Sequence, residues 1–342
     1  MWLFHFRSGG EQQTNNATNA EGIGHAIRCL RIKKTAEDKF GIKTCVITSD
    51  NFVSRDLIKN RGIEAFFDES LLFDESFMRD FEVVISDINY LDASYFKLYS
   101  KFSISVCLAP RGVGKFLADI SFKDSSFNDI QDIYDSNVYN GLKYVVTGNR
   151  YRNARKKIDT FQLIRSEDNI IISMGGLDQF DMTSSAVLGL IGCPKEWNIK
   201  IIIGPQYPHI KKLTQKIKEL NCTVEILKDP PDLYDLMASS SYGIFGSGIV
   251  SFEGVGLGLI CFNLSQSEFH KHRAEEMEQF DAGFYVGDAS IIKEGEIFKM
   301  IKRTLKSRRI DDIRKKGMSL VDSDGARRII NKIINFQNDS KK

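Results

Sequence analysis

The sequence predicts an α/β protein built from two successive doubly wound domains that face a cleft. Short apolar runs alternate with longer amphipathic stretches, as strands and helices do in a parallel sheet covered on both faces. This alternation weakens from about Lys115 to Asp168 and then restarts. The length of 342 residues is sufficient for two hydrophobic cores. We therefore expect one domain over residues 1–160 and a second over 161–342, closed by C-terminal helices.

The expected strands of the first domain are short runs rich in β-branched or aromatic residues. They are Trp2–Phe6, Thr44–Thr48, Ala65–Phe67, Val83–Ser86 and Ile104–Leu108. Helices are expected between them over His25–Phe40, Val53–Asn60 and Asp92–Ser100. Strands that alternate with helices pair in parallel, because each crossover helix carries the chain back to the end of the sheet at which the previous strand began.

The second domain shows the same alternation. Its expected strands are Asn169–Met174, Lys200–Ile203, Thr223–Leu227, Tyr242–Phe245 and Leu259–Phe262. Its expected helices are Thr183–Ile191, His209–Leu220, Leu233–Ala238, Val250–Gly256, Gln266–Phe280 and a basic helical stretch over Glu294–Phe336.

Composition excludes several classes of protein. Lys plus Arg total 47 and Asp plus Glu total 45, so the net charge of +2 lacks the basic excess of a nucleic-acid binder. The sequence has no apolar run of roughly 18 residues, which a membrane span needs. Residues Met1–Arg7 lack the basic n-region and long apolar core of a signal peptide, so we do not expect one there. Its six cysteines form no C-x-x-C pair, which argues against a zinc site and a disulfide framework. We expect a reduced, cytoplasmic protein.

The first candidate site is the run Gly22-Ile23-Gly24-His25, which follows the first strand and opens a helix. Glycines let the backbone approach a ligand, and the N–H groups of a helix start favour anions. The helix dipole disfavours imidazolium, so His25 would be neutral and able to act as a general base. A surface histidine at a helix cap is the alternative. The run lacks the third glycine of a dinucleotide fingerprint and the lysine of a P-loop.

The second candidate site is Ser173-Met174-Gly175-Gly176, at the exit of the strand that opens the second domain. The carboxyl ends of parallel strands are where α/β sheets bind ligands. Ser173 and the amides of Gly175 and Gly176 would hold a phosphate or a sugar hydroxyl. The alternative is a tight turn with Asp178 or Asp181 as the helix cap.

The remaining candidates are a glycine–serine loop, Gly246-Ser247-Gly248-Ile249, and two polar side chains that follow it. Amides of Ser247, Gly248 and Ile249 suit a diphosphate. Glu253, in the helix after the loop, would accept two hydroxyls of a ribose, unless it is an exposed helix residue. Gln266 follows another strand beside Ser265 and would face the same cleft, although Ser265 alone suits an ordinary helix cap.

In this order these candidate sites resemble one family, the nucleotide-sugar hydrolase of pseudaminic acid synthesis, UDP-2,4-diacetamido-2,4,6-trideoxy-β-L-altropyranose hydrolase. Related spore-coat polysaccharide biosynthesis proteins share the pattern. The resemblance implies a glycosyltransferase-B-like (GT-B-like) fold of two Rossmann-like domains. It rests on Phe6-Arg7-Ser8, Gly22-Ile23-Gly24-His25, Arg28-Cys29-Leu30, Asp87-Ile88-Asn89-Tyr90, Gly141-Leu142-Lys143-Tyr144, Ser173–Asp178, Glu253, Leu257-Gly258-Leu259 and Asp324–Arg328.

The resemblance implies a UDP-sugar substrate whose UDP binds to the second domain and whose sugar lies toward the first. Arg7 and Arg28 would contact the substrate there. His25 would act on a water that attacks the anomeric carbon, which releases UDP and a free sugar for pseudaminic-type acid or surface-glycan synthesis, as in flagellin glycosylation. Neither a metal nor a cofactor is implied.

Three positions depart from the family pattern. Gly9 stands where an aspartate often follows the first strand, Leu108-Ala109-Pro110 stands where the family has an aspartate pair, and Ser265 stands in place of an asparagine. These departures keep two alternatives open. One is a glycosyltransferase that passes the sugar to an acceptor hydroxyl, and the other is a nucleotide-sugar-binding protein without catalysis.

Overall fold

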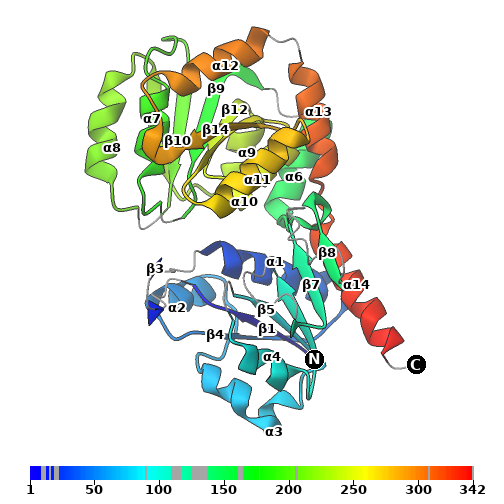
Figure 1. Ribbon diagram of the computed structural model, residues 1–342. Helices are drawn as coiled ribbons and strands as arrows, with labels where there is room; N and C mark the ends of the chain where they lie inside the picture. The colour runs from blue at the N-terminus through cyan, green and yellow to red at the C-terminus, as the bar shows by residue number, and fades with distance from the viewer. Residues whose placement is uncertain are drawn as a thin grey trace. The chain divides into compact units, whose positions relative to one another are not determined.

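A computed structural model describes residues 1–8, 13–14, 17–18, 23–88, 91–108, 117–124, 137–160, 165–176, 178–204, 207–306 and 309–340. The chain divides into two compact units. Unit 1 is Met1–Thr147 together with Asp324–Lys342, and unit 2 is Gly148–Ser323. Each unit contains one parallel sheet with helices packed against it (Figure 1). The predicted fold class, two Rossmann-like α/β domains, is therefore confirmed.

The sheet of unit 1 has six parallel strands within the described residues, in the order β4-β1-β5-β6-β7-β8. The strands are β1 (Trp2–Phe6), β4 (Thr44–Thr48), β5 (Val83–Asp87), β6 (Ile104–Leu108), β7 (Ile120–Lys123) and β8 (Val138–Asn140). A two-stranded antiparallel sheet, β2 (Gln13–Thr14) with β3 (Ala17–Thr18), follows β1. Phe66 pairs only as an isolated bridge with Ile47, so the strand expected over Ala65–Phe67 is reduced to one residue.

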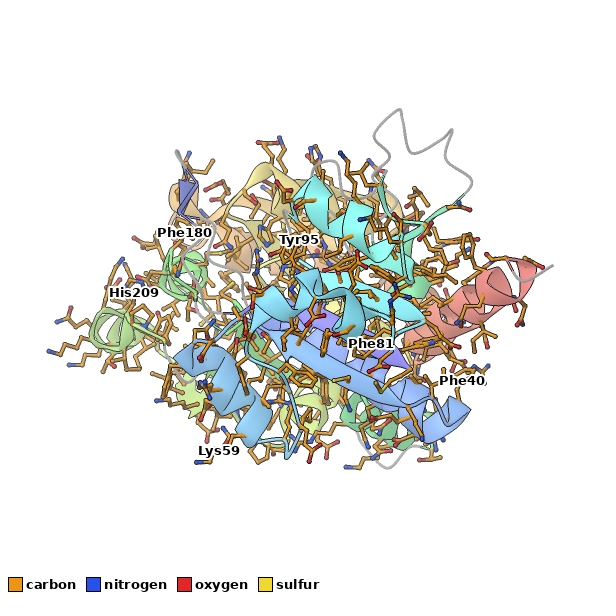
Figure 2. The ribbon with its side chains drawn as sticks, turned by 90° about the horizontal axis from the view of Figure 1, so that it is seen from below. Phe40, Lys59, Phe81, Tyr95, Phe180 and His209 are labelled. Carbon is orange, nitrogen blue, oxygen red and sulfur yellow. The ribbon has the colours of Figure 1, made fainter. Side chains whose placement is uncertain are left out.

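Helices cover both faces of this sheet because side chains of a strand alternate between faces. Phe4 and Phe6 of β1 pack in one core with α1 (Ile23–Phe40) and α14 (Gly325–Asp339). Leu3 belongs to the opposite core, with η1 (Glu69–Phe73), α3 (Glu75–Met78) and α4 (Ala93–Tyr99). The described part of unit 1 also contains α2 (Phe52–Lys59) and the short η3 (Leu142–Tyr144). Figure 2 shows α1 ending at Phe40.

The sheet of unit 2 has six parallel strands in its described part, in the order β11-β10-β9-β12-β13-β14. The strands are β9 (Ser166–Ser173), β10 (Asn198–Ile203), β11 (Thr223–Lys228), β12 (Ser240–Phe245), β13 (Ile260–Ser265) and β14 (Phe284–Asp288). Counted along the chain this is the order 3-2-1-4-5-6 of a dinucleotide-type Rossmann sheet, which reverses direction between β9 and β12. Ligands bind such sheets at the carboxyl ends of the strands that flank the reversal.

Helices again lie against the sheet of unit 2 and bury a core rich in isoleucine. They are α6 (Asn149–Asp159), α7 (Met182–Gly189), α8 (Ile210–Lys216), α9 (Leu233–Ala238), α10 (Ile249–Gly256), α11 (Glu268–Gln279), α12 (Glu296–Lys306) and α13 (Ile310–Leu320), with the short η4 (Ile217–Glu219) and η5 (Ala289–Ile291). No helix in the described part of the chain is both long and apolar enough to cross a bilayer.

The boundary between the units differs from the expected seam near residue 160. The polar stretch after Thr147 forms α6, which is anchored in unit 2 because Tyr151 Oη donates a hydrogen bond of 3.0 Å to the carbonyl of Val321. The expected helical stretch over Glu294–Phe336 consists of the three helices α12, α13 and α14, and the last belongs to unit 1 instead of closing the second domain. Its apolar face is buried in the core of unit 1 through Ala326, Ile329, Ile330 and Ile333.

Candidate active site

His25 and Asp87 meet where the strand order of the sheet in unit 1 reverses, between β1 and β5. Asp87 ends β5, which pairs with β1, and His25 lies in the first turn of α1. His25 Nδ1 is 2.7 Å from Asp87 Oδ1. The carboxylate can only accept this hydrogen bond, so Nδ1 carries the proton and Nε2 keeps its lone pair. A histidine oriented in this way can take a proton through Nε2.

Arg28 fixes the carboxylate of Asp87 from the same helix face as His25, because the two residues are three apart. Its Nε and Nη2 donate hydrogen bonds of 2.6 Å each to Asp87, one to each oxygen. Its Nη1 donates a 3.0 Å bond to Asp124, directly after β7. The side chains of Arg28 and Asp87 are buried. Such a two-pronged arrangement holds the planar groups in one orientation.

The environment keeps Asp87 ionised. Burial would raise the pKa of Asp87, but Arg28 and His25 together outweigh it and hold this pKa below its ordinary value. An ionised Asp87 stabilises the imidazolium that forms when Nε2 accepts a proton. The side chain of His25 is 17% exposed, so the ring is partly buried rather than a free surface group.

Arg7 and the glycines predicted for this site lie in different surroundings. Arg7 follows β1, and its Nε donates a 2.8 Å hydrogen bond to Glu69 Oε1, in a second polar cluster. Gly24 is exposed in the first turn of α1. Gly22 lies outside the described residues, as do Gly9, Ala109 and Pro110.

In unit 2, the turn after β9 lies at the carboxyl ends of the strands, where the strand order reverses between β9 and β12. Ser173 is the last residue of β9 and is buried, Gly175 has φ of +90°, and Gly176 is exposed. The positive φ at Gly175 suits a residue without a side chain. Asp178 caps the next helix, since its carboxylate accepts hydrogen bonds of 2.8 and 2.9 Å from the amides of Met182 and Thr183. The capping role considered for Asp178 is therefore present beside the glycine turn.

The glycine–serine loop lies next to that turn. Phe245 of β12 pairs with Ser173, and a Cβ built on Gly246 would lie 3.6 Å from Met174 Cα. Ser247 has φ of +55° and its hydroxyl donates a 2.8 Å bond to the carbonyl of Leu264. Its side chain is therefore occupied within the protein, and only its backbone remains for a ligand. The two loops form one edge of the sheet.

Gly248 and Ile249 start α10 without a side-chain cap. Gly248 is the residue before the helix, and a Cβ on it would meet no atom within 4 Å. Because glycine has no side chain at this position, an anion can approach the first backbone amides of the helix. This edge therefore presents backbone groups of the kind that bind phosphate.

Glu253 is buried at 1% exposure, so it is not the exposed helix residue considered as an alternative. Its Oε1 accepts a 2.9 Å hydrogen bond from Tyr234 of α9. Buried carboxylates need such donors because loss of hydration is otherwise unfavourable. Gln266 is exposed after β13, and the neighbouring Ser265 is buried with its hydroxyl 2.9 Å from Tyr285 Oη.

Sequence reasoning missed several partners in these sites. It placed Asp87 only in a segment that carries the resemblance and assigned no role to Asp124 or Glu69. An acidic residue at the end of a buried strand was the available signal for Asp87. Glu69 carries no such signal, because its stretch has no clear periodicity. Within the described residues, no group of three or more His, Cys, Asp or Glu side chains is arranged to hold a metal.

The two parallel sheets and their helices define a GT-B fold, and solved structures agree. MurG of Acinetobacter baumannii superposes with a TM-score of 0.67 at 13% identity and covers 98% of this chain and 99% of its own. Anabaena Alr3699/HepE in complex with UDP gives 0.62 at 13% identity, over 98% and 99%. UDP-GlcNAc 2-epimerase from Neisseria meningitidis bound to UDP-GlcNAc gives 0.59 at 12% identity, over 98% and 99%. These likenesses show the fold.

Two curated proteins are similar in sequence. The spore coat polysaccharide biosynthesis protein SpsG of Bacillus subtilis is 21% identical over 335 residues, which is 90% of this chain and 93% of that protein. An uncharacterized protein of Methanocaldococcus jannaschii, MJ1062, is 23% identical over 242 residues, 70% of this chain and 47% of its own length. This chain therefore matches about half of the longer archaeal protein. No model of a known protein family matches.

Proposed function

We propose that this protein hydrolyses a UDP-linked acetamido- or diacetamido-trideoxy sugar to UDP and the free sugar, in the synthesis of a pseudaminic-type acid or another surface glycan. The observation that carries the proposal is the His25–Asp87 pair, in which Nε2 is left as the proton acceptor. The similarity to a spore coat polysaccharide biosynthesis protein supports the biological setting. The fold shared with structures that hold UDP or UDP-GlcNAc supports the nucleotide.

In the proposed reaction, His25 Nε2 removes a proton from water as the water oxygen attacks the anomeric carbon. The bond between the anomeric carbon and the phosphate oxygen breaks, and its electron pair leaves with UDP. Asp87 stabilises the imidazolium through Nδ1–H, and Arg28 holds Asp87 in place. General-base assistance of this kind contributes about 10²- to 10⁴-fold to the rate.

Unit 2 is proposed to bind the UDP. The amides of Gly175, Gly176 and Gly248 and the start of α10 would bind the diphosphate, because helix N-termini and glycine turns favour anions. These neutral donors would also stabilise the charge that develops on the leaving diphosphate. Glu253, held by Tyr234, is proposed to accept the ribose hydroxyls.

Hydrolysis in ¹⁸O-labelled water tests the reaction. Purified protein is incubated with a panel of UDP-linked 2,4-diacetamido sugars and no acceptor, and UDP is analysed by mass spectrometry. Cleavage at carbon gives UDP without ¹⁸O, whereas attack at phosphorus labels the UDP. UDP is the informative product because free sugars exchange their anomeric oxygen with water. Labelled UDP would overturn the proposed bond cleavage.

Release of UDP also separates hydrolysis from glycosyl transfer. The same base can deprotonate an acceptor hydroxyl, so a transferase on this fold would use His25 in the same way. A hydrolase releases UDP at its full rate without acceptor, whereas a transferase needs one. A protein that binds the UDP-sugar with no release under either condition would instead fit the binding-protein alternative.

The ribose role of Glu253 is tested by UDP titration. Glu253→Gln keeps the shape of the side chain but removes its charge, so UDP affinity should fall by about tenfold. Glu225→Gln, at an exposed position of β11, is the matched control. Equal UDP affinity in the two variants would remove Glu253 from the nucleotide site.

A further inference from the structure

A second polar cluster in unit 1 is not used by the proposed reaction. It joins His5 of β1, Arg7 after β1, Glu69 of η1, and Tyr95 and Tyr99 of α4. Phe6 of β1 is paired with Asp87 of β5, the residue that hydrogen-bonds to His25. Arg7, the next residue after Phe6, therefore leaves β1 at the same end of the sheet as the His25–Asp87 pair. Glu69, Tyr95 and Tyr99, in contrast, come from elements that pack on the face opposite to α1.

Glu69 holds two donors at once. Its Oε1 accepts a 2.6 Å hydrogen bond from His5 Nε2 and a 2.8 Å bond from Arg7 Nε, while Oε2 lies 3.2 Å from the same Arg7 nitrogen. Burial would raise the pKa of Glu69, but His5 and Arg7 lower it to about 2. Glu69 is therefore a carboxylate at neutral pH.

His5 is fully buried and supports Glu69 in one orientation. Burial lowers the pKa of His5, so its ring is neutral at pH 7. Because Nε2 donates to Glu69, Nδ1 must accept, and Tyr99 Oη donates to it across 2.9 Å. The hydrogen bonds run in one direction, from Tyr99 through His5 to Glu69, and fix the carboxylate that meets Arg7.

Arg7 is restrained on more than one side and still reaches the surface. Its Nη2 donates a 3.3 Å hydrogen bond to Tyr95 Oη, and its guanidinium lies 5.9 Å from the centre of the Tyr95 ring. Figure 2 labels this tyrosine on α4. The side chains of Arg7 and Glu69 are 21% and 20% exposed, so solvent and ligands have access to the pair.

Among the described residues of these two clusters, the charges sum to no positive excess. Glu69 cancels Arg7 and His5 is neutral, while Asp87 and Asp124 together outweigh Arg28. A ligand carboxylate would meet donors whose charge is already compensated and carboxylates that repel it. A neutral carbonyl or hydroxyl oxygen can still accept a hydrogen bond from a guanidinium.

We propose that Glu69 is a positioning and specificity residue, which holds Arg7 in place and cancels its charge so that the sugar subsite accepts neutral substituents and rejects a carboxylate. This proposal rests on the proposed function, because it assigns Arg7 to the sugar of the UDP-sugar. His5 and Tyr99 act through Glu69 and do not touch the sugar.

The test compares the affinities of UDP-N-acetylglucosamine, UDP-glucuronate and UDP by calorimetry. Wild-type protein should bind the neutral sugar nucleotide more tightly than the acidic one. Glu69→Gln leaves the charge of Arg7 uncompensated, so the ratio of the two affinities should shift toward UDP-glucuronate by about tenfold. Affinity for UDP should not change. Glu75→Gln, which removes a carboxylate paired with Arg79 on the exposed face of α3, is the control and should leave the ratio unchanged.

A purely structural ion pair would give a different result. If Glu69 only ties η1 to β1, Glu69→Gln lowers stability and leaves the ratio as it is, which overturns the proposal. Arg7→Gln provides a second, independent test if Glu69→Gln fails to fold. It should weaken UDP-N-acetylglucosamine by about fivefold or more with UDP unchanged, since one charged donor is lost. Failure of wild-type protein to bind UDP would instead overturn the proposed function itself.

Discussion

The two units use the same sheet architecture but equip the same edge with different chemistry. In unit 2 the edge between β9 and β12 consists of glycine and serine loops, and the hydroxyl of Ser247 is turned into the protein. In unit 1 the corresponding edge, between β1 and β5, holds the buried charged group of Asp87, Arg28 and Asp124 beside His25. The two loops of unit 2 offer backbone amides, whereas the corresponding strand ends of unit 1 offer charged side chains.

This difference indicates two ways to stabilise charge. Backbone amides are neutral, so unit 2 can present them without any buried countercharge. Buried ionised side chains must be paired, and unit 1 pairs each of them with hydrogen bonds of 3.0 Å or less. The near balance of 47 basic and 45 acidic residues is compatible with both solutions, since neither needs a basic excess.

The largest effect is expected from removal of the proton acceptor. His25→Ala should lower the turnover of the UDP-sugar by about 10²- to 10⁴-fold, because the variant lacks the proposed general base. UDP affinity should stay the same, since the nucleotide is proposed to bind to unit 2. Turnover and UDP titration on the same preparation measure both.

His272→Ala is the control for this variant, because His272 lies on the surface of α11 and pairs with Glu275. It should change neither quantity. Unchanged turnover in His25→Ala would contradict the proposed catalytic role of unit 1. A loss of UDP binding in this variant would contradict the proposed division of roles, in which unit 2 alone binds the nucleotide.

The next effect is expected on folding. Asp87→Asn removes the charge that compensates buried Arg28, so the free energy of unfolding should fall by about 3–5 kcal/mol. Urea denaturation measures this change. Asp50→Asn, which breaks an exposed ion pair with Arg55 in the same unit, should have no measurable effect. A similar midpoint for both variants would contradict the importance of the buried pair.

The same pair predicts a dependence on pH. The pKa of Asp87 is lower in the folded protein than in the unfolded chain, so its contribution to stability is present above the unfolded value of about 4. It is lost as the pH falls through the folded value. The difference in stability between wild-type protein and Asp87→Asn should therefore be constant near neutrality and shrink in acid.

The smallest effect is expected from a change in the glycine turn after β9 in unit 2. A Cβ on Gly204, directly after β10, would lie 1.8 Å from the carbonyl oxygen of Gly176, so Gly204→Ala must displace the glycine turn. Stability should fall by about 1–3 kcal/mol, as for other overpacked sites, and UDP affinity should fall with it. Gly248→Ala meets open space and should change stability by less than about 0.5 kcal/mol. Equal stability of the two variants would show that the turn tolerates displacement.

Most of the fold was predictable because strands such as Trp2–Phe6 are short, fully buried and mostly apolar runs, and longer amphipathic stretches between such runs indicate helices. The missed strands β2, β3, β7, β8 and β14 are short or only partly buried, so their apolar pattern is weak. The helix α6 was missed because its sequence is almost wholly polar.

The site was predictable only in part, for a different reason. His25 and Glu253 are visible in sequence because each lies in or near a glycine-containing motif. Their partners Asp87 and Tyr234 come from other elements, and only the pairing of strands and the packing of α9 bring them into hydrogen-bond distance. Spacing along a chain carries no information about contacts of this kind.

The order of the segments along the chain also affects how the protein folds during synthesis. The chain leaves unit 1 after Thr147 and returns to it at Asp324, so unit 2 is inserted into unit 1. During synthesis every residue of unit 2 emerges before α14, whose Ile329, Ile330 and Ile333 complete the core of unit 1. Domains generally fold as units while the chain is made. Until unit 2 has been synthesised, the apolar face of unit 1 that α14 buries therefore has no covering helix from the chain itself.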